Sequence, residues 1–427
     1  MKNLESLYRE RNSLVNGYIS KKMINDQKYY YLQYFSNGQI KSKYIPKSEI
    51  NDILHQLNRR KEIDREIKQL ESSGSKLASL SKNHYELTGN LMSGDEVVAS
   101  FNCGILTYID NDKAPLLIKR TQNLSAYLSK RIFDESRQNT RLLKKTMSIK
   151  EKDPVMIALL VHGAALTDNY WFKARGSRLH YHDIIFSDIY ADTALKGIIY
   201  PLRRISRLSP ELTLVGSYEK CWKKIDNRWW LYKKENEQEI FSELFSYQIA
   251  ELLDIPTVKY FFEDGFIKCE NFATIYNFEP MSSLCGDDDT YQCAFDILFK
   301  LGQSFAIDYL KLMMFDIIVN NVDRHNENYG LLRDKRSGKI VSLAPNFDNN
   351  LSLIRIDPDL NNADGFLSVF KKFLLNHPVA YELYKKIHLP ILDEEKIRNV
   401  LSTIPIIVNE DKLISYILER YYKIINL

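Results

Sequence analysis

The chain has 427 residues, which is enough for two or three domains with separate cores. Hydrophobic residues make up 44% and charged residues 27%, so the composition is that of an ordinary globular protein. The 59 Lys and Arg residues against 55 Asp and Glu residues leave a net charge of +4, which is too small to indicate nucleic acid or an acidic membrane as a partner.

The N-terminus and the cysteines exclude further classes of protein. The chain begins with charged residues and no apolar core segment, so we expect no signal peptide. No apolar run reaches the roughly 18 residues of a membrane span, and we therefore expect a cytoplasmic protein with no membrane partner. The five cysteines are widely spaced and form no C-x-x-C pair, which argues against a disulfide framework or a zinc site.

Residues 1–75 are predicted to form a separate module. A charged helix is followed by two strands, Lys28–Gln33 and Ile40–Tyr44, around Asn37-Gly38, a pair that tolerates the positive φ of a tight hairpin. The apolar spacing then predicts a helix from Glu49 to Glu71. The next four residues, Ser-Ser-Gly-Ser at positions 72–75, are predicted to form a linker.

Tyrosine and lysine are frequent in this hairpin, at Tyr29, Tyr30, Tyr31, Lys41 and Lys43. Interleaved aromatic and basic side chains are typical of surfaces that bind nucleic acid. A small sheet that packs one aromatic face and exposes the other to water explains the same composition. We favour this second interpretation, so nucleic acid remains only an alternative partner of residues 1–75.

The remainder of the chain mixes strands with helices. Residues 76–200 are predicted to contain strands at Val97–Phe101 and Ile105–Ile109 and an Arg-rich helix at Leu124–Met147. The elements predicted beyond residue 200 are the strands Leu212–Val215 and Trp229–Lys233, the helix Glu239–Leu253, the hairpin strands Val258–Phe262 and Phe266–Glu270, and a helix at Leu310–Val319.

The segment after the last of these helices carries the clearest chemistry. It contains Asp323, His325 and Asn328, and Asp348 follows after Gly330 at the end of a short predicted strand. Phosphoryl transfer needs a carboxylate to orient the incoming hydroxyl and oxygen ligands for Mg²⁺. We therefore predict Asp323 as the catalytic carboxylate, Asn328 and Asp348 as Mg²⁺ ligands, and His325 as a brace or phosphate contact. The alternative is a polar turn after a helix.

A phosphate-binding loop and a positioning lysine are predicted upstream. Gly216 and the backbone N–H groups after it could surround phosphates. Lys233 ends an aromatic strand and is the candidate phosphate-binding lysine, because strand alternation would point Lys234 to the opposite face. Glu243 in the next helix is its predicted partner, with Glu239, one turn earlier, as the alternative.

These motifs together resemble the HipA-like serine/threonine protein kinases of bacteria, and the D-R-H-x-x-N loop resembles that of phosphoinositide kinases. The resemblance is strongest from Thr213 to Leu353, is weaker over residues 85–200 and does not include the first 75 residues. It implies an α+β, bilobal protein-kinase-like fold with N-terminal accessory subdomains. The implied domains are a module at 1–75, an accessory subdomain at 76–200, a small lobe at 201–272 and a helical lobe at 273–427.

The resemblance also implies roles for individual residues. The family's phosphate loop, V-A-G-A-Q-E-K, corresponds to Leu214–Lys220, which contains Gly216, Ser217 and Lys220. The remaining nucleotide contacts implied are Lys233 with its partner Glu243, and the adenine hinge Glu270-Asn271-Phe272. Members of the family can inactivate themselves by phosphorylating a hydroxyl three residues before the loop glycine, so Thr213, and Ser217 within the loop, are candidate autophosphorylation sites.

The sequence thus predicts an ATP- and Mg²⁺-dependent serine/threonine protein kinase with a protein substrate. The resemblance further implies that the protein is the toxin of a toxin–antitoxin pair and that its partner is a small DNA-binding antitoxin. Two alternatives stay open: a lipid or small-molecule kinase, since the loop motif is shared, and a regulatory pseudokinase that binds nucleic acid through residues 1–75.

Overall fold

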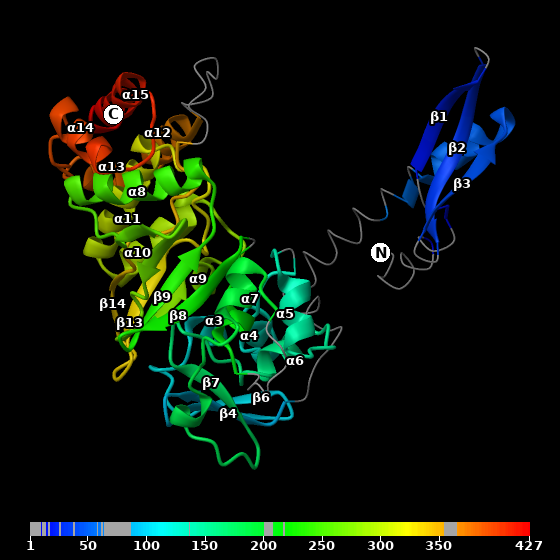
Figure 1. The fold of residues 1–427 in the computed structure, drawn as a ribbon, viewed down its shortest axis with the longest axis horizontal. Helices are drawn as coiled ribbons and strands as arrows, with labels where there is room; N and C mark the ends of the chain where they lie inside the picture. Colours follow the sequence, from blue (N-terminus) through cyan, green and yellow to red (C-terminus); the bar gives the residue numbers. More distant parts are fainter. Residues whose placement is uncertain are drawn as a thin grey trace. The chain divides into compact units, whose positions relative to one another are not determined.

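The computed structural model divides into two compact units, Met1–His84 and Tyr85–Leu427 (Figure 1). It describes residues 10, 14–15, 18–24, 27–36, 39–57, 59–60, 63, 87–135, 137–199, 208–216, 218–353 and 365–427. Within these ranges, no helix combines the length and the apolar character needed to cross a membrane.

The first unit contains a three-stranded antiparallel sheet of β1 (Tyr18–Ile24), β2 (Gln27–Ser36) and β3 (Gln39–Ile45), in that order. The pairing of Ser36 with Gln39 confirms the predicted hairpin, although its two turn residues lie outside the described residues. Strand β1 was missed because the lysine pair in its middle interrupts the hydrophobic alternation that marks a strand. The predicted linker at 72–75 also lies outside the described residues.

One face of this sheet is covered by a helix. After the short 3₁₀ turn η1 (Lys47–Glu49), the chain is helical from residue 50 to residue 57. Leu57 on this helix forms a small core with Leu32 on β2 and Ile45 on β3. The predicted helix is therefore confirmed over its first part, and its second half lies mostly outside the described residues.

The second unit begins with an antiparallel sheet in the order β6-β5-β4-β7, formed by β4 (Gly89–Ser93), β5 (Glu96–Asn102), β6 (Ile105–Tyr108) and β7 (Tyr170–Ala174). The strands β5 and β6 were predicted. The short helices that accompany this sheet are α3 (Leu116–Thr121), α4 (Leu124–Ser129), α5 (Thr140–Thr146), α6 (Pro154–Leu159) and α7 (Ala191–Lys196), with the 3₁₀ turn η3 at Tyr181–Ile184.

The single helix predicted at Leu124–Met147 is wrong. The structure has α4 and α5 there, separated by a loop in which Arg131 and Arg137 turn inward. Asn139, immediately before α5, has a left-handed φ of 64°, which a continuous helix does not allow. Two arginines of the predicted Arg-rich helix, Arg131 and Arg137, instead form ion pairs in which their side chains are 11% and 0% exposed.

A second antiparallel sheet, in the order β10-β11-β9-β8, consists of β8 (Lys220–Ile225), β9 (Arg228–Lys233), β10 (Tyr260–Glu263) and β11 (Phe266–Glu270). Helix α8 (Glu237–Leu252) follows β9 and starts with a capping box formed by Asn236 and Glu239. Strand β9 and helix α8 match the predicted strand Trp229–Lys233 and the predicted helix Glu239–Leu253 closely. The strand predicted at Leu212–Val215 is wrong: Pro210–Thr213 is the 3₁₀ turn η4, because Ser209 caps Glu211 N and Pro210 favours a helical start.

The third sheet of the unit joins β12 (Tyr276–Pro280), β13 (Gly330–Asp334) and β14 (Ile340–Leu343). A Cβ at Gly330 would collide with the backbone of Glu279, so only glycine lets these two strands pair so closely. The sheet sets the exit of the Asp323 loop, because the chain enters β13 directly from Asn328 and Tyr329.

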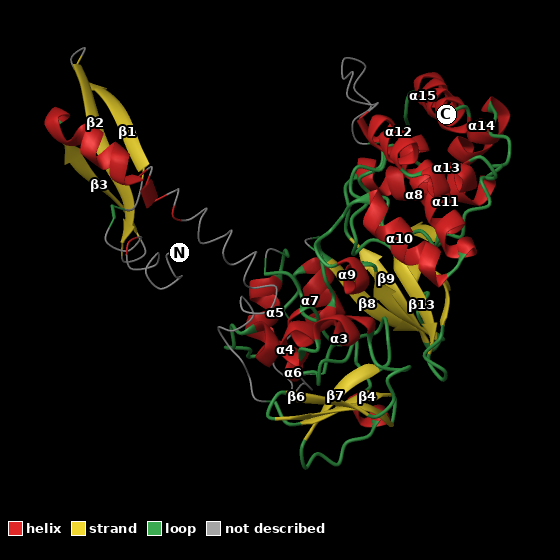
Figure 2. Ribbon diagram, turned by 180° about the vertical axis from the view of Figure 1, so that it is seen from behind, coloured by secondary structure: helices red, strands yellow, loops and turns green. Residues whose placement is uncertain are grey.

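Helices make up most of the C-terminal part: α9 (Ser282–Cys285), α10 (Tyr291–Leu301), α11 (Gln303–Ile318), α12 (Gly365–Asn376), α13 (Pro378–Tyr384), α14 (Glu394–Ser402) and α15 (Glu410–Ile425). Figure 2 shows α12–α15 at one end of the unit and the β4–β7 sheet at the other, with β8, β9 and β13 between them. Helix α11, predicted from its apolar run at Leu310–Val319, begins earlier, at Gln303; its second half is buried among the other helices and delivers the chain into the Asp323 loop.

Candidate functional site

A cavity of about 580 Å³ lies between the β8–β11 sheet and the Asp323 loop. The residues of the predicted site that line it are Thr213, Gly216, Lys220, Lys233, Glu270, Phe272, Asp323, His325, Asn328 and Asp348. They come from segments more than a hundred residues apart. Glu243 lies behind Lys233 rather than on the wall, and Ser217 is outside the described residues.

Lys233 is the centre of the charge network in this cavity. Its Nζ lies 2.8 Å from Glu243 Oε1, 2.5 Å from Asp348 Oδ1 and 3.6 Å from Glu235 Oε1. Burial lowers the pKa of Lys233, but the charges of Asp348 and Glu243 outweigh it and hold the pKa well above its ordinary value. Lys233 is therefore a permanent cation in the wall of the cavity.

The neighbouring lysine is arranged differently. Strand alternation turns Lys234 to the other face, where its side chain is 53% exposed and pairs with Glu219. The alternative partner Glu239 accepts a hydrogen bond from the Tyr218 hydroxyl at 2.9 Å and completes the cap of α8. Glu243, and not Glu239, contacts Lys233.

Asp348 is held from several sides. Its backbone N–H donates to the Tyr260 hydroxyl at 3.0 Å, and the N–H of the next residue, Asn349, donates to Glu243 Oε2 at 2.9 Å. Burial raises the pKa of the Asp348 carboxyl, but Lys233 and Lys220 lower it far more, so the net pKa lies well below its usual range. Asp348 is ionised at every physiological pH.

Arg324 fixes the conformation of the Asp323 loop. This buried guanidinium binds both carboxylate oxygens of Asp316 at the end of α11, each at 2.9 Å. It also donates to the backbone oxygens of Asn328 and Phe347 at 2.8 and 2.9 Å. One side chain thus ties the Asp323 loop to the segment that carries Asp348. Arg324 was not among the predicted site residues, although it is part of the D-R-H-x-x-N motif.

Asp323 is the most accessible carboxylate in this group, with its side chain 43% exposed. Partial burial of the carboxyl raises the pKa of Asp323, and the nearby charge of Asp348 raises it further. His325 lowers this pKa, but the net shift is upward. His325 Nε2 lies 3.9 Å from Asp323 Oδ2. A carboxylate with a raised pKa at the mouth of a cavity is suited to accept a proton.

The donor set next to Asp323 fits a hard cation. Asn328 donates its amide N–H to Asp323 O at 3.0 Å, which turns its carbonyl oxygen away from the backbone. Carboxylate and amide oxygens, here Asp348 and Asn328, are ligands that Mg²⁺ accepts, usually with waters completing its shell. In the described part of the chain, no cluster of three or more His, Cys, Asp or Glu residues could hold a metal by itself, so a cation here would need further ligands from solvent or substrate.

The Gly216 loop also lines the cavity. Gly216 has φ of 111°, which disfavours other residues, and a Cβ there would collide with the Lys220 ammonium. Burial lowers the pKa of Lys220 to about 8, although Asp348 partly opposes this shift. Thr213 precedes the loop in η4 and donates its hydroxyl to Pro210 O at 3.1 Å.

Aromatic and aliphatic side chains form the remaining wall. Phe272 lies 5.3 Å from Phe347 and 5.5 Å from Phe278, measured between ring centroids. Leu231 and Val258 also line this part. The backbone of Glu270-Asn271-Phe272 runs beside it, and Asn271 N donates to Trp229 O at 2.9 Å. A flat apolar slot bordered by backbone polar groups suits a heteroaromatic base.

Two buried ion pairs, both missed by sequence analysis, attach the β4–β7 part to this cavity. Arg137 pairs with Glu211 in complete burial, and donates to the backbone oxygens of Leu214 at 3.3 Å and of Lys220, on either side of Gly216. Arg131 binds Asp168 through two hydrogen bonds of 2.7 and 2.8 Å. Their partners are 37 to 83 residues away, so local patterns in the sequence give no signal for them.

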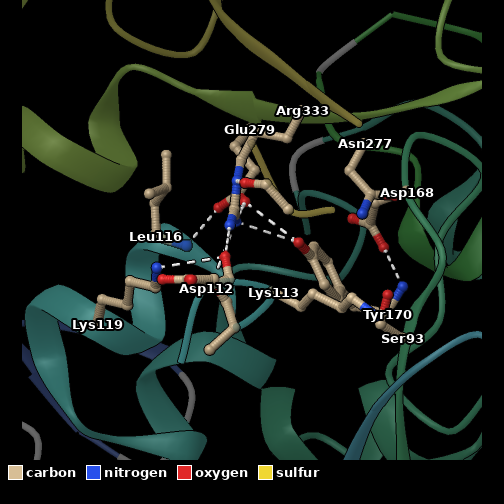
Figure 3. Close-up of polar contacts among 12 residues, drawn as sticks. Ser93, Asp112, Lys113, Leu116, Lys119, Asp168, Tyr170, Asn277, Glu279 and Arg333 are labelled. Atoms are coloured by element: carbon tan, nitrogen blue, oxygen red, sulfur yellow. Dashed lines mark hydrogen bonds and ion pairs between the residues drawn. The ribbon is translucent and has the colours of Figure 1, made fainter. Parts of the chain in front are cut away.

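A third ion pair, Arg333 with Glu279, is drawn in Figure 3. Arg333 on β13 also donates to the Tyr170 hydroxyl at 3.1 Å and to Ala114 O at 3.0 Å, and Glu279 Oε2 accepts from Leu116 N at 2.5 Å. The pair therefore joins β12 and β13 to α3 and β7. Burial raises the pKa of Glu279, while Arg333 lowers it.

Comparisons with known proteins give the following similarities. The family model described as a domain of unknown function, DUF6788, matches residues 2–55. The chain is similar to the proinflammatory kinase CtkA of Helicobacter pylori, with a TM-score of 0.37 and 20% identity, over 48% of this chain and 91% of that chain. No curated protein matches it.

The chain is also similar to a chain in the structure of the Shewanella oneidensis MR-1 toxin–antitoxin system HipA, HipB and its operator DNA. The TM-score is 0.48 and the identity 13%, over 79% of this chain and 96% of that chain. Both TM-scores lie below 0.5, so neither likeness by itself indicates what this chain does.

Proposed function

We propose that the Tyr85–Leu427 unit transfers the γ-phosphoryl group of ATP to a serine or threonine hydroxyl of a protein. One observation carries the proposal: Lys233 is held by Glu243 and Asp348 in the same cavity that Asp323 lines. A fixed cation, an ionised carboxylate and an accessible base are what phosphoryl transfer requires of a protein. The small lobe would be the β8–β11 sheet with α8, and the large lobe the C-terminal helices.

In this proposal, each part of the nucleotide has its own place in the cavity. The adenine would lie against Phe347 and Leu231, beside the backbone of Glu270-Asn271-Phe272. The phosphates would lie between the Gly216 loop and Lys233. Asn328 and Asp348 would hold Mg²⁺, which when bound neutralises charge on the phosphates.

Asp323 would act on the acceptor. Its carboxylate orients the acceptor hydroxyl and takes the hydroxyl proton as the new oxygen–phosphorus bond forms. The bond between the γ-phosphorus and the bridging oxygen breaks, and ADP leaves with that oxygen. Lys233 and the Gly216 loop hold the phosphates in line for this displacement, since the cation is already fixed before the substrate arrives.

The proposal is tested by incubating the full chain with Mg²⁺ and labelled ATP in the presence of three kinds of acceptor. These are a serine- and threonine-rich protein mixture, phosphoinositide vesicles and small polyols. We expect label on protein, at serine or threonine by mass spectrometry, with Thr213 and Ser217 inspected for self-modification. Label on lipid or polyol alone would refute the protein acceptor, and no label with no ATP binding would refute phosphoryl transfer altogether.

The lowered pKa of Lys220 predicts a pH dependence of nucleotide affinity. A Lys220 pKa of about 8 means that the free protein loses this charge as the pH rises above 8. Nucleotide phosphates favour the charged form, so binding takes up a proton in this range. The Kd for ATP should therefore rise by up to about tenfold per pH unit above 8. Isothermal titration from pH 7 to 9.5 measures this. The Lys220→Met variant should bind more weakly with little pH dependence, and an unchanged profile in that variant would contradict the assignment.

A further inference from the structure

Basic residues are concentrated in the first compact unit. Residues 1–84 contain 16 Lys and Arg against 9 Asp and Glu, a net charge of +7. The other 343 residues contain 43 against 46, a net charge of −3. The small net charge of the whole chain therefore conceals a strongly basic unit joined to a weakly acidic one. Such asymmetry is typical of a chain with one polyanion-binding part.

The strand register shows which side chains share the uncovered face of the β1–β3 sheet. Leu32 and Ile45 pack against the helix, so their neighbours in the strands point to the other face. Tyr31 is paired with Tyr44 and Gln33 with Ser42 across β2 and β3, while Ser20 on β1 is paired with Tyr31. With Tyr29, these residues form what we call the tyrosine face.

The tyrosine face is ordered and accessible. Gln33 donates to Ser20 Oγ at 3.1 Å and to Ser42 Oγ at 3.0 Å, which links all three strands. The Tyr44 ring is 48% exposed and lies 6.1 Å from the ring of Tyr29 and 5.7 Å from that of Tyr31, between centroids. Three aromatic rings are thus held together on a flat surface with polar residues beside them.

Exposed lysines lie in the same sheet, beside the tyrosine face rather than on it. Lys28, Lys41 and Lys43 are all exposed, but the register pairs Lys43 with Leu32, so Lys41 and Lys43 leave β3, an edge strand, on the side that the helix covers. Residues 18–45 contain five lysines and a single acidic residue, Asp26. A ligand on this face would therefore meet aromatic rings in its centre, and it would meet the ammonium groups of Lys41 and Lys43 where it passes over the edge strand β3.

We propose that the tyrosine face binds single-stranded nucleic acid. Unpaired bases stack on tyrosine rings without regard to sequence, and lysines at the edge neutralise the phosphates. A protein partner would be expected to meet a more apolar surface at the centre of the face, and the residues of this face are tyrosine, serine and glutamine. This inference is independent of the phosphoryl transfer proposed for the second unit.

The test measures fluorescence anisotropy of labelled twenty-nucleotide oligo(dT), oligo(U) and a duplex of equal length with the full chain. We expect a single strand to bind more tightly than the duplex, with an affinity that falls as salt rises. Tyr44→Leu should weaken binding by about tenfold through lost stacking. Lys41→Ala combined with Lys43→Ala should reduce the slope of log Kd against log salt by about 1.4.

A matched control removes two exposed lysines from the other unit, Lys371→Ala with Lys372→Ala, and should leave binding unchanged. Far-ultraviolet circular dichroism checks that each variant is folded, and the lysine variants test the proposal even if Tyr44→Leu does not fold. Preference for the duplex, no binding at low salt, or equal binding by the tyrosine, lysine and control variants would each overturn the proposal.

Discussion

Replacing Asp323 by asparagine is expected to lower kcat by about 10² to 10⁴-fold, because the acceptor hydroxyl loses its base. The Kd for ATP should change less than about threefold. The contacts that hold Lys233 are made by Glu243 and Asp348, and they stay intact in this variant. Steady-state phosphorylation and ATP titration with the same preparation measure the two quantities.

The control for this variant is Glu327→Gln, which neutralises another exposed carboxylate of the same loop. It should retain kcat within a few-fold. Equal losses in the two variants would mean that net charge of the loop, and not the position of Asp323, determines the rate. Since the pKa of Asp323 is raised, the wild-type rate should also fall with decreasing pH at a higher pH than for an ordinary aspartate.

Replacing Arg333 by methionine is expected to destabilise the second unit by about 3 to 5 kcal/mol, because Glu279 is left buried and charged without its partner. The variant also removes donors to the Tyr170 hydroxyl and to Ala114 O, which hold β7 and α3 against β13. Urea denaturation followed by tryptophan fluorescence measures the change.

Arg336→Met is the matched control, since Arg336 is an exposed arginine three residues further along the chain, and its effect should be within about 0.5 kcal/mol. Adding Glu279→Leu to Arg333→Met should recover part of the loss, because a buried ion pair replaced by apolar groups leaves no uncompensated charge. A single variant as stable as the wild type would show that this ion pair does not hold the β4–β7 part in place.

The parts of the fold that follow from local pattern could be predicted. The hairpin β10–β11 was located from Asp264-Gly265, whose φ values of 50° and 80° match the expected turn. The second half of helix α11 follows from a largely apolar run, which only Lys311 and Asp316 interrupt. The resemblance carried by the motifs placed Lys233, Asp323 and Asp348, which the structure brings to one cavity.

The parts of the fold and of the site that depend on residues far apart in the chain could not be predicted from the sequence. The loop between α4 and α5 was taken for a helix because nothing local shows that Arg137 is buried against Glu211 and the ends of the Gly216 loop. Tyr260 is unremarkable within its strand, yet its hydroxyl accepts the N–H of Asp348. Strand alternation favoured Lys233 over Lys234, but the choice of Glu243 over Glu239 depends on how α8 packs against β9, which spacing alone does not determine.

The central claim is that one cavity binds ATP with Mg²⁺ through Lys233, Asn328 and Asp348. Isothermal titration of the full chain with a non-hydrolysable ATP analogue, with and without Mg²⁺, tests it most directly. We predict binding that Mg²⁺ tightens by at least about tenfold in the wild type, and much less in Asp348→Asn, which loses a hard ligand for the cation. Absence of binding, or an equal effect of Mg²⁺ in the wild type and in Asp348→Asn, would contradict the account.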